Sequence, residues 1–298
     1  MAEAAASAQG DLLRGRAEQL SATLPALLVE ANRVAATVSQ GVHGRRRVGS
    51  GETFWQFRRY QTGDPVSAID WRQSAKRIPI YIRQNEWEAA QSVWLWADAS
   101  ASMDYHSDAV DEAKLARAHL LLLALASLLA RAGEQFGLLD RESVIWRGRS
   151  AMDRLTESLL RNDISSTDGL PQPAQMPRYA QTVWFGDFLA PLDETEARIR
   201  YFAGQCLAGH LVQILDPAEE DLPFKGRTHF EGLEGEGRYL VGRTESLRDE
   251  YRNTFAARQA ALRAMTRSVG WTFISHRTDR PPQSAMLALY RMLTERVM

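Results

Sequence analysis

Short apolar runs alternate with longer segments of helical periodicity from about residue 92 onward. Such runs are typical of strands buried on both faces of a sheet, and the longer segments of helices packed on it. The predicted strands are 93–97, 136–139, 144–146, 182–185, 211–215, 238–241 and 271–274. The predicted helices are 115–130, 152–160, 195–207, 246–269 and 284–296. This alternation predicts an α/β fold with a doubly wound, mostly parallel sheet flanked by helices.

Residues 1–40 predict an N-terminal helical segment. Its apolar residues recur at alternating spacings of four and three, namely Leu13, Ala17, Leu20, Leu24, Leu27, Ala31, Val34 and Val38. Pro25 predicts a kink or the start of a second helix. These apolar residues could pack the helix against its own domain, or they could form a contact surface for a helix of a partner protein.

Residues 41–90 form a different kind of segment, in which glycines interrupt the helical pattern and aromatic residues alternate with basic ones. A strand is predicted at 78–82, and Pro79 indicates an edge position, because proline cannot donate to a neighbouring strand. We interpret the segment as a small β-rich insertion. The predicted organisation is therefore 1–40, 41–90 and a main α/β domain at 91–298.

The composition is that of a globular protein, since 45% of the 298 residues are hydrophobic and the net charge is −1. This excludes disorder as the main state and argues against a dedicated nucleic-acid binder. The single cysteine, Cys206, excludes an internal disulfide and a multi-cysteine metal site. The longest apolar run is too short to cross a bilayer, which takes about 20 residues. No basic residue precedes Arg14 to mark a secretory signal, so we expect a cytoplasmic protein.

Arginine outnumbers lysine 33 to 3, which fits either a GC-rich genome or a demand for guanidinium groups that bind carboxylates or phosphates. Nine basic residues lie between 45 and 83, interleaved with aromatic residues. This segment has the composition of a nucleic-acid surface. Acidic neighbours such as Glu52, Asp64 and Asp70 favour internal pairing instead. A third possibility is docking to an acidic surface of a partner protein.

Asp98, Ser100 and Ser102 directly follow the predicted strand 93–97. In open α/β sheets, ligands bind outside the carboxyl ends of the strands. One carboxylate and two hydroxyls at alternate positions of a loop can converge on a hard cation such as Mg²⁺ or Mn²⁺. Asp187 follows another predicted strand and offers a second carboxylate, and the loop at 165–169 offers further hydroxyls. The sequence therefore suggests a metal site built only from oxygens.

The same residues also fit a structural role, because Asp and Ser after a strand often cap the next helix. Other chemistries fit the pattern less well. Ser100 stands where haloacid-dehalogenase-type phosphatases carry a second aspartate. The serines lack the Gly-x-Ser-x-Gly context of α/β-hydrolases, and no phosphate-binding Gly-x4-Gly-Lys-Ser/Thr loop occurs. None of the six histidines pairs at metal-ligand spacing.

Two groups of residues resemble known families. Asp98-x-Ser100-x-Ser102 resembles the metal-ion-dependent adhesion site of von Willebrand factor type A domains. Four upstream segments resemble the signature of the Domain of Unknown Function 58 family, namely Gly49-Ser-Gly-Glu-Thr-Phe54, Arg58-Arg-Tyr60, Gly63-Asp64 and Ile69-Asp-Trp-Arg-Gln-Ser-Ala-Lys76. In that family this segment comes just before a type A-like domain. The resemblance extends from about residue 24 to the C-terminus and implies a von Willebrand factor type A-like fold in the short, soluble form.

By position, the resemblance implies three metal loops. Asp98, Ser100 and Ser102 would form the first, Thr167 would supply the hydroxyl of the second, and Asp187 the carboxylate of the third. Gly186 stands where similar proteins usually have serine.

Similar proteins are not known as enzymes and often occur with MoxR-type AAA+ ATPases. The resemblance therefore implies a non-enzymatic module that binds a partner's carboxylate through Mg²⁺ or Mn²⁺, with such an ATPase as the expected partner. Two alternatives stay open. One is a metal-dependent hydrolase that uses Asp98 and Asp187, with His106 or Asp104 as base. The other is a structural adaptor with a vestigial site.

Overall fold

The computed structural model describes residues 2–23, 47–49, 53–60, 69–75, 80–87, 92–132, 134–139, 145–146, 150–160, 169–177, 180–205, 208–235 and 237–295. The chain divides into two compact units. One comprises residues 1–29 and 91–296, and the other comprises residues 30–90 with the last two residues. The larger unit carries the predicted metal loops.

A mixed, mostly parallel sheet of six strands forms the centre of the larger unit, in the order β11-β8-β7-β4-β5-β6. Its strands are β4 (Ser92–Ala97), β5 (Gln135–Leu138), β6 (Ile145–Trp146), β7 (Gln181–Gly186), β8 (Ala208–Leu215) and β11 (Thr272–Arg277). All neighbouring pairs are parallel except β5 with β6. The strand order runs outward in both directions from β4 and β7, so the sheet is doubly wound as predicted.

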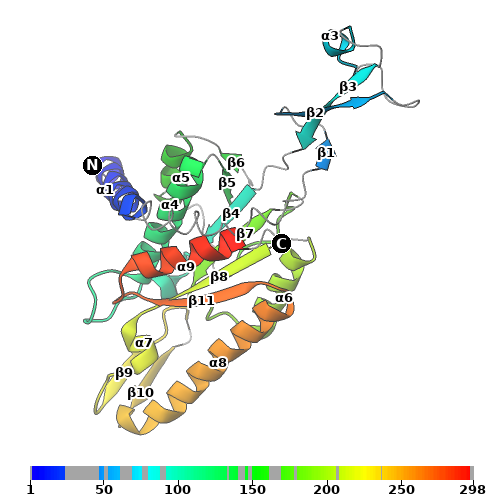
Figure 1. The fold of residues 1–298 in the computed structure, drawn as a ribbon. Helices are drawn as coiled ribbons and strands as arrows, with labels where there is room; N and C mark the ends of the chain where they lie inside the picture. The colour runs from blue at the N-terminus through cyan, green and yellow to red at the C-terminus, as the bar shows by residue number, and fades with distance from the viewer. Residues whose placement is uncertain are drawn as a thin grey trace. The chain divides into compact units, whose positions relative to one another are not determined.

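Helices cover both faces of this sheet (Figure 1). They are α1 (Ala2–Thr23), α4 (Lys114–Ala132), α5 (Ser150–Leu160) and α9 (Pro282–Glu295) on one face, and α6 (Leu192–Ala203) and α8 (Arg248–Ser268) on the other. The side chains of β4 alternate between the two apolar cores that these helices cover. Val93 and Leu95 belong to one core, and Trp94 and Trp96 belong to the other. Both faces are buried, which explains the continuous apolar runs in the sequence.

The predicted docking of the N-terminal helix on its own domain is confirmed for α1. Ala17 and Leu20 are buried in the core shared with α4, and Ser21 Oγ lies 3.1 Å from Ser127 Oγ. The remainder of the predicted 1–40 segment, with Pro25, lies outside the described residues. None of the helices in the described ranges is both long and apolar enough to cross a membrane.

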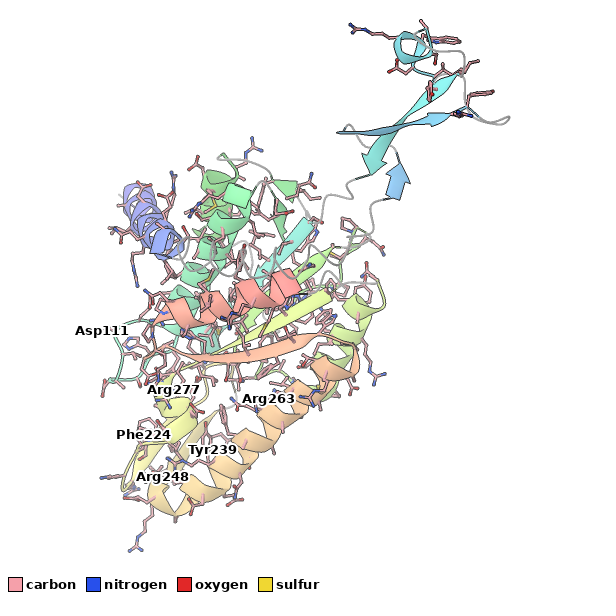
Figure 2. All side chains as sticks on the ribbon, viewed as in Figure 1. Asp111, Phe224, Tyr239, Arg248, Arg263 and Arg277 are labelled. Carbon is pink, nitrogen blue, oxygen red and sulfur yellow. The ribbon has the colours of Figure 1, made fainter. Side chains whose placement is uncertain are left out.

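A short helix and a hairpin connect β8 to α8. Helix α7 (Pro217–Asp221) begins at Asp216 with a capping box to Glu219. The hairpin consists of β9 (Thr228–Glu231) and β10 (Arg238–Val241), and the 3-10 turn η3 (Thr244–Leu247) leads into α8. Arg248 donates to the carbonyls of Leu222 and Phe224, and these bonds attach the start of α8 to the segment after α7 (Figure 2). The predicted strand 238–241 thus belongs to a separate two-stranded sheet.

The smaller unit contains a three-stranded antiparallel sheet in the order β1-β3-β2. Its strands are β1 (Arg47–Gly49), β2 (Thr53–Arg59) and β3 (Tyr81–Trp87), and it also contains the short helix α3 (Trp71–Ser74). Of the predicted strand 78–82, residues 78 and 79 lie outside the described residues, and residues 81 and 82 belong to a strand whose predicted edge position was wrong. Strand β3 begins at Tyr81 and lies in the middle of the sheet, so position 79 precedes the strand and the proline restriction does not apply to it.

Candidate metal site

The candidate site lies where the strand order reverses. The chain leaves β4 toward β5 on one side, and it continues through β7 to β8 and β11 on the other. At such a point the loops after two adjacent parallel strands diverge and leave a crevice for a ligand. Asp98 follows β4 and Asp187 follows β7, so the two carboxylates are brought to the same edge of the sheet.

The loop after β4 folds onto the Asp98 carboxylate. Asp98 Oδ1 accepts a 2.9 Å hydrogen bond from the Ser100 backbone, and Ser100 Oγ lies 3.1 Å from Ser102 Oγ. The 3-10 turn η2 (Ala101–Asp104) then carries Ser102 into the site, where its hydroxyl donates to Asp187 Oδ2 at 2.8 Å. The structure thus brings together four of the five predicted ligands, Asp98, Ser100, Ser102 and Asp187. Thr167 lies outside the described residues.

The two carboxylates have opposite environments. Asp187 Oδ2 accepts hydrogen bonds from Ser102 and from the ammonium of Lys114, and Oδ1 accepts one from the Leu189 backbone at 3.2 Å. Asp98 Oδ2 is buried and has no hydrogen-bond partner among the described residues. A buried carboxylate oxygen without a donor costs free energy, so a group that binds there would stabilise the folded protein.

Two glycines border Asp98 Oδ2. A Cβ at Gly186 would lie 3.2 Å from this oxygen and only 2.9 Å from Asp98 Cβ. A Cβ at Gly169, whose φ is +61°, would lie 3.5 Å from the same oxygen. The absence of a side chain at position 186 therefore has a steric reason in this chain.

The electrostatics of the site follow from its burial. Asp98 is 0% exposed, and burial, followed by the negative charge of Asp187, raises the pKa of Asp98 to about 7. The hydrogen bonds from Ser100 oppose this rise, and Glu234 in the β9–β10 turn adds a small further increase. Burial alone would lower the pKa of Lys114, but Asp187 and Glu219 outweigh it and keep the ammonium charged.

Residues of β8 and α8 hold the loop that carries Asp187. Arg258 donates to the carbonyls of Phe188 and Ala190, and Gln213 donates to the carbonyl of Asp187 at 3.0 Å. Phe188 adopts a φ of 54°, which costs energy for a residue with a side chain. These hydrogen bonds stabilise the turn at Phe188, whose backbone conformation is otherwise unfavourable.

The side chains of Asp98, Ser100 and Ser102 offer the kind of ligand atoms that a hard cation prefers. The donors are two hydroxyls and a carboxylate, one of whose oxygens has no partner among the described residues, and this is oxygen chemistry suited to Mg²⁺ or Mn²⁺. No group of three or more His, Cys, Asp or Glu side chains that could hold a metal occurs within the described ranges. Any ion here would therefore depend on the serine hydroxyls as well as on Asp98.

The general bases considered for a hydrolase are not part of this cluster. Asp104 and His106 are both exposed, and the His106 ring lies 3.4 Å from the carbonyl of Ser107. Lys114 is the residue of the site that the sequence interpretation missed. A signal was present, because one of only three lysines stands at the first position of a long helix, where the helix dipole disfavours a cation.

Comparison with known proteins gives the family. The family model "Protein of unknown function DUF58" matches residues 56–261, which is more than half of the chain. The chain belongs to this family. Uncharacterised proteins of Mycobacterium bovis and Mycobacterium tuberculosis are 26% identical to this DUF58 chain over 289 residues, covering 90% of it and 89% of their own length.

Two solved structures are similar to this DUF58 chain. A conserved hypothetical protein BatB from Bacteroides thetaiotaomicron matches with 15% identity and a TM-score of 0.44, covering 69% of this chain and 98% of its own. An aerotolerance-related membrane protein from Bacteroides fragilis matches with 14% identity and a TM-score of 0.38, covering 69% and 99%.

Proposed function

We propose that the larger unit is a non-enzymatic, metal-dependent protein-interaction module that binds a carboxylate of a partner protein. One observation carries the proposal: Asp98 Oδ2 is buried, has no hydrogen-bond partner in the described part of the chain, and lies beside Ser100 and Ser102 at the switch point of the sheet. The finer fold assignment, a von Willebrand factor type A-like domain, belongs to the same proposal and is supported by that motif in that place.

Each residue has a distinct part in this proposal. Asp98 supplies the anionic oxygen, Ser100 and Ser102 supply neutral oxygens, and Thr167 is the further hydroxyl that the family resemblance implies. Asp187 orients Ser102 by accepting its hydroxyl proton. When bound, Mg²⁺ or Mn²⁺ would supply a positive centre that attracts an external carboxylate. Ser100 and Ser102 are 5% and 7% exposed, against 0% for Asp98 and 1% for Asp187, so all four residues are buried and the serines are slightly less so than the carboxylates.

The partner proposed first is a MoxR-type AAA+ ATPase in the cytoplasm. Its support is the family resemblance alone, and fold-level analogy of this kind does not replace evidence from the site.

Thermal unfolding with Mg²⁺ and with a chelator tests the metal dependence. We expect Mg²⁺ to raise the melting temperature of the wild type and to have no effect on Asp98→Ala. Asp104→Ala, which removes an exposed carboxylate from the same loop, should behave as wild type. A wild type that melts at the same temperature in both conditions would contradict the proposal. Pull-down of the purified ATPase with and without chelator tests the partner.

A structural adaptor that binds its partner without metal is the second candidate, and one observation favours it. The ammonium of Lys114 already neutralises Asp187, so the cluster contains a cation of its own. This candidate predicts that Asp98→Ala and the chelator leave the pull-down unchanged. The hydrolase gains no support, because no hydrogen bond or ion pair in the described ranges joins Asp104 or His106 to Asp98 or Asp187.

A further inference from the structure

Lys114 is the first residue of α4 and is completely buried. Lysine is almost never fully buried unless it is paired, and this one has two anionic partners. Its Nζ lies 2.9 Å from Asp187 Oδ2 and 2.5 Å from Glu219 Oε1. Because Glu219 belongs to α7 and Asp187 follows β7, the ammonium joins two loops at the carboxyl edge of the sheet.

The contacts of Lys114 determine which carboxylate the site can offer to a metal ion. The oxygen of Asp187 that accepts from Lys114 also accepts from Ser102, while its other oxygen accepts from the Leu189 backbone. Both oxygens of Asp187 are thus occupied by donors, one of them a full positive charge. Asp98 has no cationic partner among the described residues, and one of its oxygens has no donor there.

We propose that Lys114 is a built-in cation that withholds Asp187 from the metal ion and thereby leaves Asp98 as the only anionic ligand in the described part of the site. This inference rests on the proposed metal-dependent function and assigns a specificity-determining residue to it. Lys114 acts through Asp187 and is therefore a positioning residue.

The consequence for ligand binding is electrostatic. A divalent cation held by one carboxylate keeps a net positive charge, whereas two carboxylates neutralise it, and the attraction for a third carboxylate falls accordingly. Lys114 would therefore weaken the binding of the ion and strengthen the recognition of the partner's acidic side chain. An ion held by Asp98 and Asp187 together would bind more tightly and recognise the partner less well.

Removal of the ammonium tests this role. Isothermal titration of the full chain with Mg²⁺ and with Mn²⁺ should show Lys114→Met binding at least about tenfold more tightly than the wild type, because a repelling charge is lost and a carboxylate is released. In chelator, Lys114→Met should melt at a lower temperature than the wild type, since Asp187 is then buried without a cation. Addition of Mg²⁺ should raise its melting temperature by more than that of the wild type. A purely structural lysine would lower both melting temperatures equally.

Glu219→Gln is the matched control. It removes one acceptor of Lys114 but keeps the ammonium beside Asp187, so the affinity for Mg²⁺ should not rise. Lys114→Met combined with Asp187→Asn removes the buried pair without leaving a charge, and it covers the case in which the single variant does not fold. Its Mg²⁺ affinity should stay within about threefold of the wild type, since its site has the same net charge. A loss of tenfold or more would show that Asp187 holds the ion in the wild type and would overturn the proposal.

The outcomes separate this inference from the proposed function. Binding by Lys114→Met but not by the wild type would contradict the proposed function and support the role of Lys114. Binding by the wild type that is equal to or tighter than that of Lys114→Met would support the function and overturn the inference. Absence of Mg²⁺ binding in both proteins would overturn both.

Discussion

Asp98→Asn is the substitution that most directly separates a metal ligand from a carboxylate that only holds a local turn. Asparagine keeps an oxygen that can accept from the Ser100 backbone, as Asp98 Oδ1 does. It replaces Oδ2, the oxygen without a donor in the described part of the chain, by an uncharged NH₂ group. The change therefore removes the buried charge and preserves the local turn.

The magnitude follows from the pKa of Asp98. Burial and the charge of Asp187 raise this pKa from 3.8 to about 7, a difference that corresponds to about 4 kcal/mol. Because folding raises the pKa of the Asp98 carboxyl group, its protonated form stabilises the folded wild type. This stabilisation is complete below about pH 4 and is lost as the pH rises through about 7. A buried NH₂ group without an acceptor costs about 1–3 kcal/mol. The metal-free variant should thus be more stable than the wild type at pH 8 by about 2 kcal/mol, or about 4–8 °C for a unit of this size.

Thermal unfolding at pH 8 and pH 5 in chelator, monitored by tryptophan fluorescence, measures this difference. Trp94, Trp96 and Trp184 are buried in the larger unit and should report its unfolding. The advantage of Asp98→Asn should be present at pH 8 and should shrink or vanish at pH 5, where the wild-type carboxyl group is protonated. With Mg²⁺ the order should reverse, because only the wild type gains stability from the ion.

The reasoning is refuted if Asp98→Asn is less stable than the wild type in chelator at pH 8. That result would mean that Oδ2 has a strong partner and that the carboxylate stabilises the fold without metal. Asp104→Asn, at an exposed position of η2, should leave the melting temperature unchanged at both pH values.

Three further predictions concern the surroundings of the site. Gly186→Ala should cost about 1–3 kcal/mol and weaken Mg²⁺ binding, because its Cβ would lie 2.9 Å from Asp98 Cβ. Gly242→Ala, with no atom within 4 Å of the added Cβ, should be neutral in the same melts. Burial lowers the pKa of His119 to about 4, so this residue should cost the protein up to about 3 kcal/mol of stability as the pH falls from about 6.5 to 4. His119→Leu should flatten that part of a denaturant-unfolding pH profile, and an unchanged slope would contradict the assignment. Arg258→Gln should lower Mg²⁺ affinity in titration calorimetry, because the loop after β7 loses its guanidinium clamp; an unchanged affinity would show that other contacts hold the loop.

The central sheet was predictable because its strands are buried on both faces and its helices have strong apolar periodicity. Two of the elements missed by the sequence interpretation are short. Strand β9 has only four residues, with alternating partial burial, and it pairs only with β10. Helix α7 has five residues and no apolar stripe, although Asp216, Pro217 and Glu219 are the residues of a capping box and a helix start. The edge assignment at 78–82 was wrong because a proline just before a strand does not restrict the strand itself.

The clustering of Asp98, Ser100, Ser102 and Asp187 was predictable, because residues that follow adjacent parallel strands lie at one edge of the sheet. The pairing of Lys114 with Asp187 and Glu219 was not predictable from the sequence. Lys114 comes from a helix, Glu219 from a helix after β8, and Asp187 from the end of β7. Only the tertiary arrangement shows that these three residues form ion pairs.

A local turn after β4 accounts for part of the Asp98 environment and fails for the rest. The turn requires one oxygen that accepts from the Ser100 backbone, and Oδ1 meets that need; it is not a helix cap, because the N-cap of η2 is Ser100, whose side chain forms no capping bond. It gives no reason for the second oxygen to be buried without a donor from the described residues, or for glycines to border it. Nor does it explain why the neighbouring carboxylate, Asp187, is paired with a buried lysine while Asp98 has no cationic partner in the ranges that the structure describes. The proposed cation-binding role for Asp98 would explain the three observations together, since such a site needs one carboxylate that is held in place and has no cationic partner among the described residues.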